Sequence, residues 1–288
     1  MKGLTKIIIN ALVVVLLAVS CFGLVGCKKD IKTVELTISL YDYENNEMYD
    51  ESDVTITIDL YRHLAPKTVD KMVEYVNDGY YDGAIFYKMV GQSNQIMLGD
   101  LKLVNNEIVQ NAIMPTIEGE FEYGGTIGSN LVNEKGSIGL WRTWTAYDEE
   151  QGDYYKTNTS IDTGRATWYM PTTSITSYNK WMCVFGKLVL DNESTATAIE
   201  GIINAFSDGG EYEEYVVYYT GEYDESKVND NHGLEFHCVP IDEFDEDMAD
   251  LFVAEGSQYA CYNHYTIQVP VTGTNGSIAA KVVSAKVI

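Results

Sequence analysis

The sequence of 288 residues predicts a mostly β domain, an antiparallel barrel or sandwich capped by two α-helices. Three observations support this fold class. Apolar and polar residues alternate in many short stretches, as they do in half-buried strands. Only two stretches have the 3–4–3 spacing of an amphipathic helix. Strands and helices do not alternate in the rhythm of a parallel α/β sheet.

The expected strands run from one end of the chain to the other. Residues 34–40 and 54–60 alternate with period two, and the polar stretch between them predicts a hairpin or a long loop. A turn and strand are expected over 80–90, with Asp82-Gly83 at the turn. Further strands are expected at 136–142, 167–170, 182–190, 234–238, 265–269 and 278–288.

Two helices are expected between these strands. The first begins near Pro66, since proline is harmless in a first helical turn, and it ends at Asn77-Asp78-Gly79. The second has Ser194 as its expected N-cap. Their apolar faces are formed by Val69, Met72, Val73 and Val76 in the first helix and by Ile199, Ile202, Ile203 and Phe206 in the second.

The first 30 residues predict export and anchoring at a membrane. Lys2 and Lys6 precede the apolar run 7–17, which is short for a bilayer crossing and typical of a signal peptide core. The run leads to Leu24-Val25-Gly26-Cys27, which resembles a bacterial lipobox; an ordinary secretory signal is the alternative. The resemblance implies a signal peptide over 1–26, a lipidated Cys27, a tether over 27–33 and an extracytoplasmic domain held at the membrane through its lipid anchor only.

The formal net charge of −24 argues against nucleic-acid partners, because their affinity comes largely from Lys and Arg. Residues 208–256 contain 16 Asp and Glu against the single Lys227. This stretch is either a solvated subdomain that keeps the protein soluble or a docking surface for a basic partner. The spacing of its acids matches no calcium-loop motif.

The cysteines and histidines predict no metal site, since neither type has the spacing of metal ligands. Cys183 lies in an apolar run and is expected to be a buried small side chain. Cys238 and Cys261 could form a disulfide in an exported protein, or both could be free.

One long stretch resembles the cyclophilin family. Residues 64–86 read Leu-Ala-Pro-Lys-Thr-Val-Asp-Lys-Met-Val-Glu-Tyr-Val-Asn-Asp-Gly-Tyr-Tyr-Asp-Gly-Ala-Ile-Phe, close to the first helix and following strand of that family. Shorter matches follow in the family's order at 95–100, 136–140, 184–189 and 280–288. The resemblance covers about 54–206 and 275–288 within a domain spanning 34–288, and it leaves 145–165 and a large acidic segment, 207–274, as insertions.

This resemblance implies a closed antiparallel barrel of eight strands capped by two helices. It also implies peptidyl-prolyl cis–trans isomerase activity on proline-containing segments of exported proteins, with no metal or cofactor. The rotation to be accelerated has a barrier of about 18–20 kcal/mol. A non-catalytic peptide-binding module or chaperone with the same fold is the alternative, and a solute-binding lipoprotein is a distant third.

The resemblance also assigns a site. In Phe86-Tyr87-Lys88, Lys88 occupies the place of the family's arginine, which bonds to the proline nitrogen and weakens amide resonance. Lysine keeps the charge and loses the planar set of donors. The chain has one extra residue between Phe86 and Asp100 relative to the family pattern. The residues expected to line the proline slot are Phe86, Met97, Trp168, Tyr169, Tyr178 and Met182.

Overall fold

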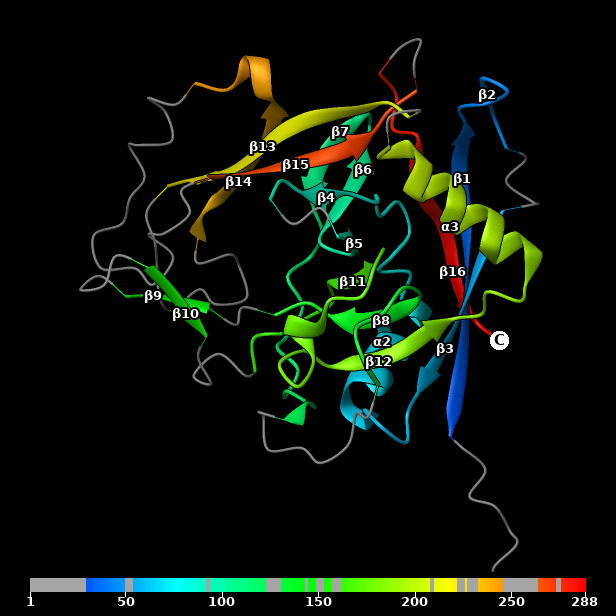
Figure 1. Ribbon diagram of the computed structural model, residues 1–288. Helices are drawn as coiled ribbons and strands as arrows, with labels where there is room; N and C mark the ends of the chain where they lie inside the picture. Colours follow the sequence, from blue (N-terminus) through cyan, green and yellow to red (C-terminus); the bar gives the residue numbers. More distant parts are fainter. Residues whose placement is uncertain are drawn as a thin grey trace, which may run out of the picture. The chain divides into compact units, whose positions relative to one another are not determined.

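Seven strands form one curled antiparallel sheet in the computed structural model (Figure 1). Their order is β16-β1-β3-β12-β8-β11-β5, and the short strand β2 pairs with β1. The bounds are β1 (Ile31–Asp42), β2 (Glu47–Met48), β3 (Thr55–Tyr61), β5 (Gln95–Leu98), β8 (Ser137–Leu140), β11 (Trp168–Pro171), β12 (Val184–Leu188) and β16 (Ala280–Val287). The mostly β class and the first two expected strands are confirmed.

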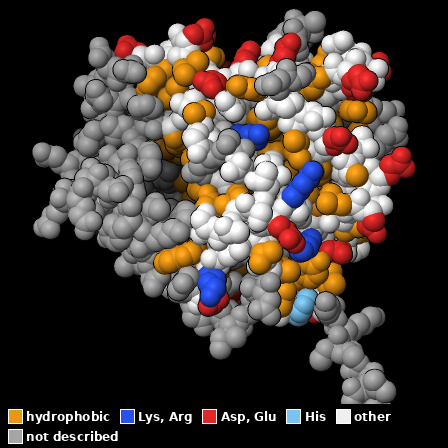
Figure 2. Space-filling model, in the orientation of Figure 1, with side chains coloured by type: hydrophobic (Ala, Val, Ile, Leu, Met, Phe, Trp, Pro, Cys, Tyr) orange, Lys and Arg blue, Asp and Glu red, His pale blue; other side chains and the backbone are white. Residues whose placement is uncertain are grey.

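The structure describes residues 30–49, 54–91, 94–122, 131–142, 145–148, 153–156, 162–207, 210–221, 226, 233–245, 264–272 and 276–288. The expected signal peptide over 1–26 and Cys27 lie outside these ranges, as does Cys261. Figure 2 shows acidic side chains around the margin of one face, with hydrophobic side chains between them.

Two helices accompany the sheet, as the sequence predicts: α2 (Pro66–Asn77) and α3 (Glu193–Ala205). The N-cap of α3 is Asn192, whose side chain accepts a hydrogen bond from the Thr195 backbone, so the prediction of Ser194 as the cap is wrong. Ser194 instead accepts a 2.7 Å hydrogen bond from the Thr55 backbone and thereby joins α3 to β3. Neither described helix is long and apolar enough to span a bilayer.

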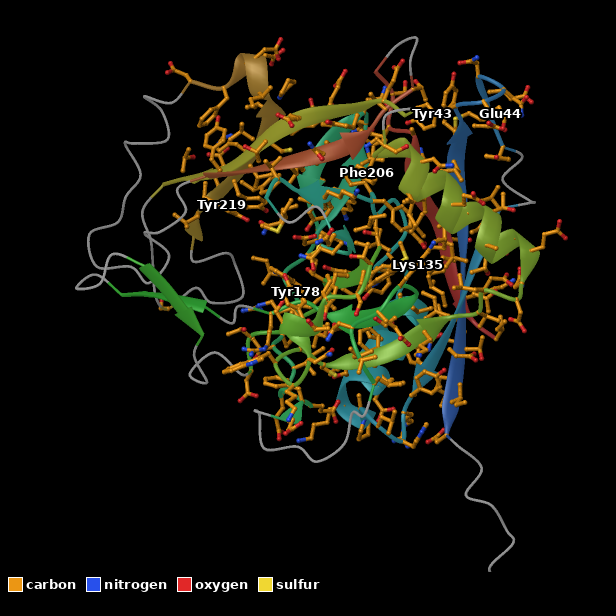
Figure 3. All side chains as sticks on the ribbon, viewed as in Figure 1. Tyr43, Glu44, Lys135, Tyr178, Phe206 and Tyr219 are labelled. Atoms are coloured by element: carbon orange, nitrogen blue, oxygen red, sulfur yellow. The ribbon has the colours of Figure 1, made fainter. Side chains whose placement is uncertain are left out.

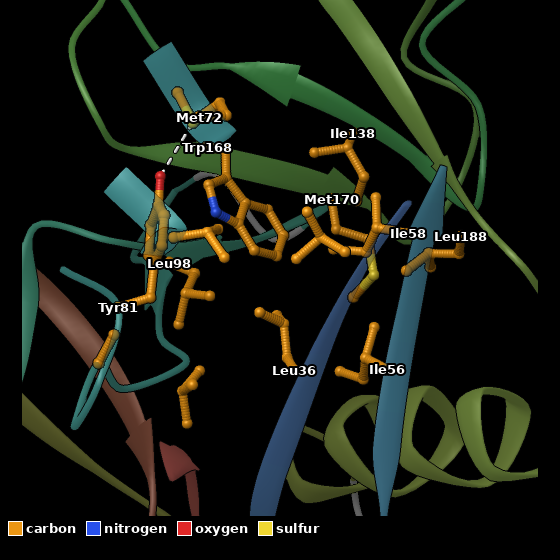
Figure 4. Close-up of a cluster of buried hydrophobic side chains, with 14 of the residues drawn as sticks. Leu36, Ile56, Ile58, Met72, Tyr81, Leu98, Ile138, Trp168, Met170 and Leu188 are labelled. Atoms are coloured by element: carbon orange, nitrogen blue, oxygen red, sulfur yellow. Dashed lines mark hydrogen bonds between the residues drawn. The ribbon is translucent and has the colours of Figure 1, made fainter. Parts of the chain in front are cut away.

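The main core lies between the curled sheet and its helices, and we call it the barrel core (Figure 4). It gathers alternate residues of β1 and β3 with the apolar faces of both helices. Tyr81 donates hydrogen bonds from its hydroxyl toward Met72 Sδ and the Ala166 carbonyl oxygen, both at 2.9 Å. The side chains labelled in Figure 4 are Leu36, Ile56, Ile58, Met72, Tyr81, Leu98, Ile138, Trp168, Met170 and Leu188.

The two ends of the seven-strand sheet approach one stretch of chain, residues 84–87. Ile85 makes a single bridge to Lys281 of β16, and Tyr87 makes a single bridge to Met97 of β5. Phe86 adds a 3.3 Å backbone hydrogen bond to Ala280. The contacts of 84–87 are bridges rather than a continuous strand, so the closed barrel of eight strands stays a prediction.

A second antiparallel sheet has the order β14-β13-β15-β4. Three of its strands come from the acidic segment 207–274: β13 (Tyr212–Thr220), β14 (Glu235–Pro240) and β15 (His264–Pro270). The fourth, β4 (Lys88–Met89), directly follows the stretch 84–87, so the acidic segment pairs with the part of the chain that carries the expected site.

Two hairpins were not expected. β6 (Leu101–Val104) and β7 (Glu107–Gln110) are joined by Asn105-Asn106, both with positive φ, as a two-residue hairpin turn requires. β9 (Thr145–Asp148) and β10 (Asp153–Lys156) pair within 145–165, which the sequence analysis identified as an insertion without predicting strands in it.

The N-terminus of α2 depends on a distant carboxylate. Glu120, only 4% exposed, accepts hydrogen bonds from the backbones of Lys67 (3.0 Å) and Thr68 (2.7 Å). The helix has no side-chain cap of its own, since its N-cap is Ala65. A carboxylate at this end satisfies free N–H groups and interacts favourably with the helix dipole.

We therefore expect Glu120→Ala to lower the free energy of unfolding by about 2 kcal/mol, because it leaves two helix N–H groups without their acceptor. Urea denaturation followed by circular dichroism measures the loss. Glu118→Ala is the matched control, since Glu118 bonds to the exposed ammonium of the same Lys67 and little change is expected. Equal losses in the two variants would contradict the capping role.

Candidate functional site

Four of the six residues expected to line the proline slot pack together in a second buried cluster, which we call the slot-side cluster. The four are Met97, Tyr169, Tyr178 and Met182. They come from β5, from β11, from the 3-10 helix η2 (Thr176–Tyr178) and from the turn before β12. The full cluster consists of Ile85, Tyr87, Met97, Leu101, Ile108, Tyr169, Tyr178, Met182, Val217, Ile267 and Val269.

The other two, Phe86 and Trp168, lie in the barrel core instead. Each is the sequence neighbour of a slot-side residue, Tyr87 and Tyr169 respectively. Successive side chains of an extended chain point to opposite faces, so the two members of each pair separate into different clusters. The structure does not bring Phe86 and Trp168 together with the other four expected slot residues.

Tyr169 is enclosed on several sides. A Cβ placed on Gly139 of the neighbouring strand β8 would lie 2.3 Å from the Tyr169 ring, so the ring lies directly against that glycine. The rings of Trp141 and Tyr178 meet it edge-on, with centroids at 6.1 and 5.7 Å. Its hydroxyl donates a hydrogen bond to Asn133 Oδ1. The ring is therefore held in one position and is fully buried.

Lys88 lies away from this cluster. Its ammonium lies 4.7 Å from the centre of the Phe206 ring, in a cation–π contact. Figure 3 labels Phe206, which lies at the end of α3. Burial lowers the pKa of Lys88. Its backbone pairs with Gln268 of β15, while its neighbours Tyr87 and Met89 pack into or against the slot-side cluster.

The strand register explains this position. Tyr87 and Met97 exchange backbone hydrogen bonds of 3.2 and 2.8 Å, so their side chains share one face. Ile85, Tyr87 and Met89 therefore lie on the slot side, and Ala84, Phe86 and Lys88 lie on the other. A shift of one residue moves a side chain to the opposite face, and the chain has one extra residue between Phe86 and Asp100. The role of Lys88 as the polarising cation stays a prediction.

Tyr87 is a further polar residue on the slot side, which the sequence analysis did not select. Its hydroxyl donates to the Asp100 carboxylate, at 2.7 and 2.9 Å from the two oxygens. Burial raises the pKa of Asp100, an effect that the hydrogen bond from Tyr87 opposes. Burial also raises the pKa of Tyr87 well above its ordinary value, so the phenol stays protonated. The sequence alone does not reveal that Tyr87 is paired with Met97, because it does not fix which residues lie opposite one another on the two segments.

The Tyr87–Asp100 pair lies where the acidic segment meets the rest of the fold. Tyr219 of β13 accepts a 3.3 Å hydrogen bond from Gln110 of β7. The charge of Asp100 contributes to the raised pKa values of Tyr219 and Tyr265, for which burial is the larger cause. One half-buried carboxylate is thus close to tyrosines from two strands of the acidic segment.

Arg142 is a buried cation that the sequence analysis also missed. Only 3% exposed, its guanidinium lies 4.4 Å from the centre of the Phe121 ring, and Nε donates a 2.8 Å hydrogen bond to the Trp181 carbonyl. Burial lowers the pKa of Arg142 to about 10. An arginine directly after an apolar strand was the available signal. The contacts place it as a link between the chain after β8 and the turn before β12.

The described part of the chain offers no group of three or more His, Cys, Asp or Glu side chains suited to a metal ion. Cys183 is buried beside Thr68, and burial raises the pKa of its thiol to about 12. Cys238 is a free, half-buried thiol. The arrangement is a buried apolar and aromatic cluster that contains Tyr87, whose hydroxyl bonds to Asp100.

We expect Tyr87→Phe to destabilise the fold in a pH-dependent way. The pKa of Asp100 in the folded chain is raised from 3.8, so its carboxyl group stays protonated to a higher pH in the folded chain than in the unfolded chain. The contribution of Asp100 to the free energy of unfolding therefore falls as pH rises above about 3.8. Loss of the Tyr87 donor raises that pKa further. The deficit of the variant should be smallest in acid and reach about 1–3 kcal/mol at pH 7.

Denaturation at several pH values measures this deficit. Tyr43→Phe is the control, because the Tyr43 hydroxyl donates a 2.7 Å hydrogen bond to the neutral carbonyl of Val271. Its deficit should not change between pH 4 and pH 7. Parallel pH profiles for the two variants would refute the ionic role of Asp100.

Comparisons with known proteins show the family to which the chain belongs. The family model described as cyclophilin type peptidyl-prolyl cis-trans isomerase/CLD matches residues 47–213. Similar solved structures include a cyclophilin type peptidyl-prolyl cis-trans isomerase of Cryptosporidium parvum in the presence of the dipeptide Ala-Pro (16% identity, 58% of this chain and 84% of that chain, TM-score 0.34).

A second structure of that protein gives 15% identity, 58% and 83% coverage and a TM-score of 0.37. No curated protein matches the chain. The family match spans more than half of the sequence and includes α2, β5, β8, β11, β12 and α3. The chain belongs to the family of cyclophilin type peptidyl-prolyl cis–trans isomerases.

Proposed function

We propose that this chain is a peptidyl-prolyl cis–trans isomerase that acts on proline-containing segments of exported proteins. The family match over 47–213 is the observation that carries the proposal. The gathering of Met97, Tyr169, Tyr178 and Met182 in one cluster supports it, since these side chains are suited to packing on a proline ring.

The chemistry requires neither a nucleophile nor a cofactor. Water bonded to an amide oxygen stabilises the planar, charge-separated form, so an apolar surface that excludes water favours the twisted form with a C–N single bond. Uncatalysed prolyl isomerisation takes roughly 10–100 s, which leaves room for a weak catalyst to matter. The role of this chain's aromatic cluster is to bind the proline ring and remove that water.

The site of action follows from the lipobox-like sequence. A lipid on Cys27 would hold the domain at the extracytoplasmic side of a membrane, where exported chains refold. Incorporation of a radiolabelled fatty acid by the wild type and not by Cys27→Ser tests the anchor. Equal labelling of both would exclude Cys27 as the lipidated residue.

Peptide binding without turnover is the second candidate, and the position of Lys88 favours it. The ammonium lies over Phe206, on the face opposite Met97, so the expected cation is not beside the expected slot. A cyclophilin-like binding module or chaperone needs the apolar surface and not the cation.

An NMR exchange assay on Ala-Pro peptides separates the two candidates. We expect acceleration above the uncatalysed rate at micromolar protein, and no acceleration would eliminate the isomerase proposal. Because of its contact with Phe206, we expect Lys88→Ala to keep turnover within about threefold of wild type, less than 1 kcal/mol in the barrier.

Lys102→Ala, which changes another half-buried strand lysine, is the matched control. A tenfold or greater loss of turnover in Lys88→Ala, with no such loss in Lys102→Ala, would mean that Lys88 acts as the polarising cation, the role that the sequence resemblance implies.

A further inference from the structure

The acidic segment contributes to the same buried cluster as the expected slot. Val217 of β13 and Ile267 and Val269 of β15 are buried in the slot-side cluster with Met97 and Tyr169. Of the slot residues, Met97 and Tyr169 are fully buried, Met182 is 2% exposed and Tyr178 is 9% exposed. A proline ring cannot contact these side chains while they are covered to this extent.

The cover is attached through main-chain pairing. Ile267 and Gln268 of β15 pair with Met89 and Lys88 of β4, and Val90 donates a 2.9 Å hydrogen bond to the Thr266 carbonyl. β4 has only two residues, so this attachment is short. Few backbone bonds therefore need to break for β15 to separate from β4.

Side-chain contacts add to this attachment. Gln110 of β7 bonds to Tyr219 of β13 at 3.3 Å. The Asp100 charge lies close to Tyr219 and Tyr265 of the acidic segment. These contacts are polar, whereas Val217, Ile267 and Val269 contribute apolar side chains to the slot-side cluster.

We propose that the sheet β13–β15 is an autoinhibitory cover, and that proline peptides reach the slot-side cluster only when this sheet separates from β4. The proposal rests on the proposed function, since it names what controls access to that site. In the closed state the cover shields the apolar surface that an exported isomerase would otherwise present to solvent. A client segment competes with β15 for that surface.

Two substitutions on β15 test the cover. Ile267→Asp places a carboxylate on the face of β15 that is buried in the slot-side cluster. This substitution weakens the docking of β15 on the cluster, because an unpaired carboxylate is costly to bury. Thr266→Asp places the same charge one residue away, on the half-buried outer face of the same strand. We expect Ile267→Asp to bind a dye-labelled Ala-Pro peptide at least tenfold more tightly than wild type, and Thr266→Asp to bind as wild type.

A reversible cross-link gives the opposite test. Met89 and Ile267 are directly opposite each other in the antiparallel pair. Because the adjacent pair, Val90 and Thr266, is hydrogen-bonded, Met89 and Ile267 form a non-hydrogen-bonded pair, whose close spacing is suited to a disulfide. Met89→Cys and Ile267→Cys are combined with Cys21→Ser, Cys27→Ser, Cys238→Ser and Cys261→Ser, which leaves only the buried Cys183 besides the new pair. We expect the oxidised form to bind the peptide at least tenfold more weakly than its reduced form. Hydrogen exchange of the β5 amides should slow in parallel.

Equal peptide binding by the oxidised and reduced forms would overturn the proposal, even if Ile267→Asp failed to fold. Turnover separates this outcome from failure of the proposed function. If binding follows the cross-link and no form accelerates isomerisation, the cover stands and the isomerase proposal fails. If all forms accelerate isomerisation equally, the isomerase proposal stands and the cover proposal fails.

Discussion

The pairing of Tyr87 with Met97 decides which side chains belong to the site. Side chains of adjacent residues in an extended chain point to opposite faces, so this single register divides 84–89 between two clusters. Tyr87 faces Met97 and Tyr169, whereas Phe86 enters the barrel core and Lys88 reaches Phe206. The same stretch bridges both end strands of the curled sheet, so a change of register would disturb the fold as well as the site.

The acidic segment has an apolar inner face despite its composition. β13 alternates so that Tyr215, Val217 and Tyr219 face the slot-side cluster, while its acids lie toward the exposed end of the strand. The negative charge of this segment is compatible with docking, because most of its described acids are exposed and the contact is made by aliphatic and aromatic groups. The half-buried carboxylate of Asp100, which follows β5 outside this segment, accepts a hydrogen bond from the hydroxyl of Tyr87, and this bond stabilises its charged form.

Much of the fold could be predicted from the sequence, because period-two alternation and 3–4–3 spacing are local signals. They located β1, β3, α2 and α3 to within a few residues. The site was predictable only in part. The matched motif grouped Met97, Tyr169, Tyr178 and Met182, which the structure packs in one cluster, but it did not show that Tyr87 rather than Lys88 faces Met97. Glu120 and Asp100 act through contacts between distant segments, for which a single sequence contains no periodic signal.

The energetics of docking suggest how rarely the cover would open. Full burial of an aliphatic side chain contributes about 1.5–3 kcal/mol, so Val217, Ile267 and Val269 together favour the closed state by several kcal/mol before the entropy of ordering the segment is subtracted. A net preference of about 2.7 kcal/mol leaves roughly 1% of molecules open and weakens the apparent peptide affinity about a hundredfold. A client with exposed apolar residues around its proline would recover part of that energy by replacing β15 on the slot-side cluster. On the proposed function, selectivity for unfolded over folded clients would follow from the closed state, because an unfolded segment presents more apolar surface with which to compete.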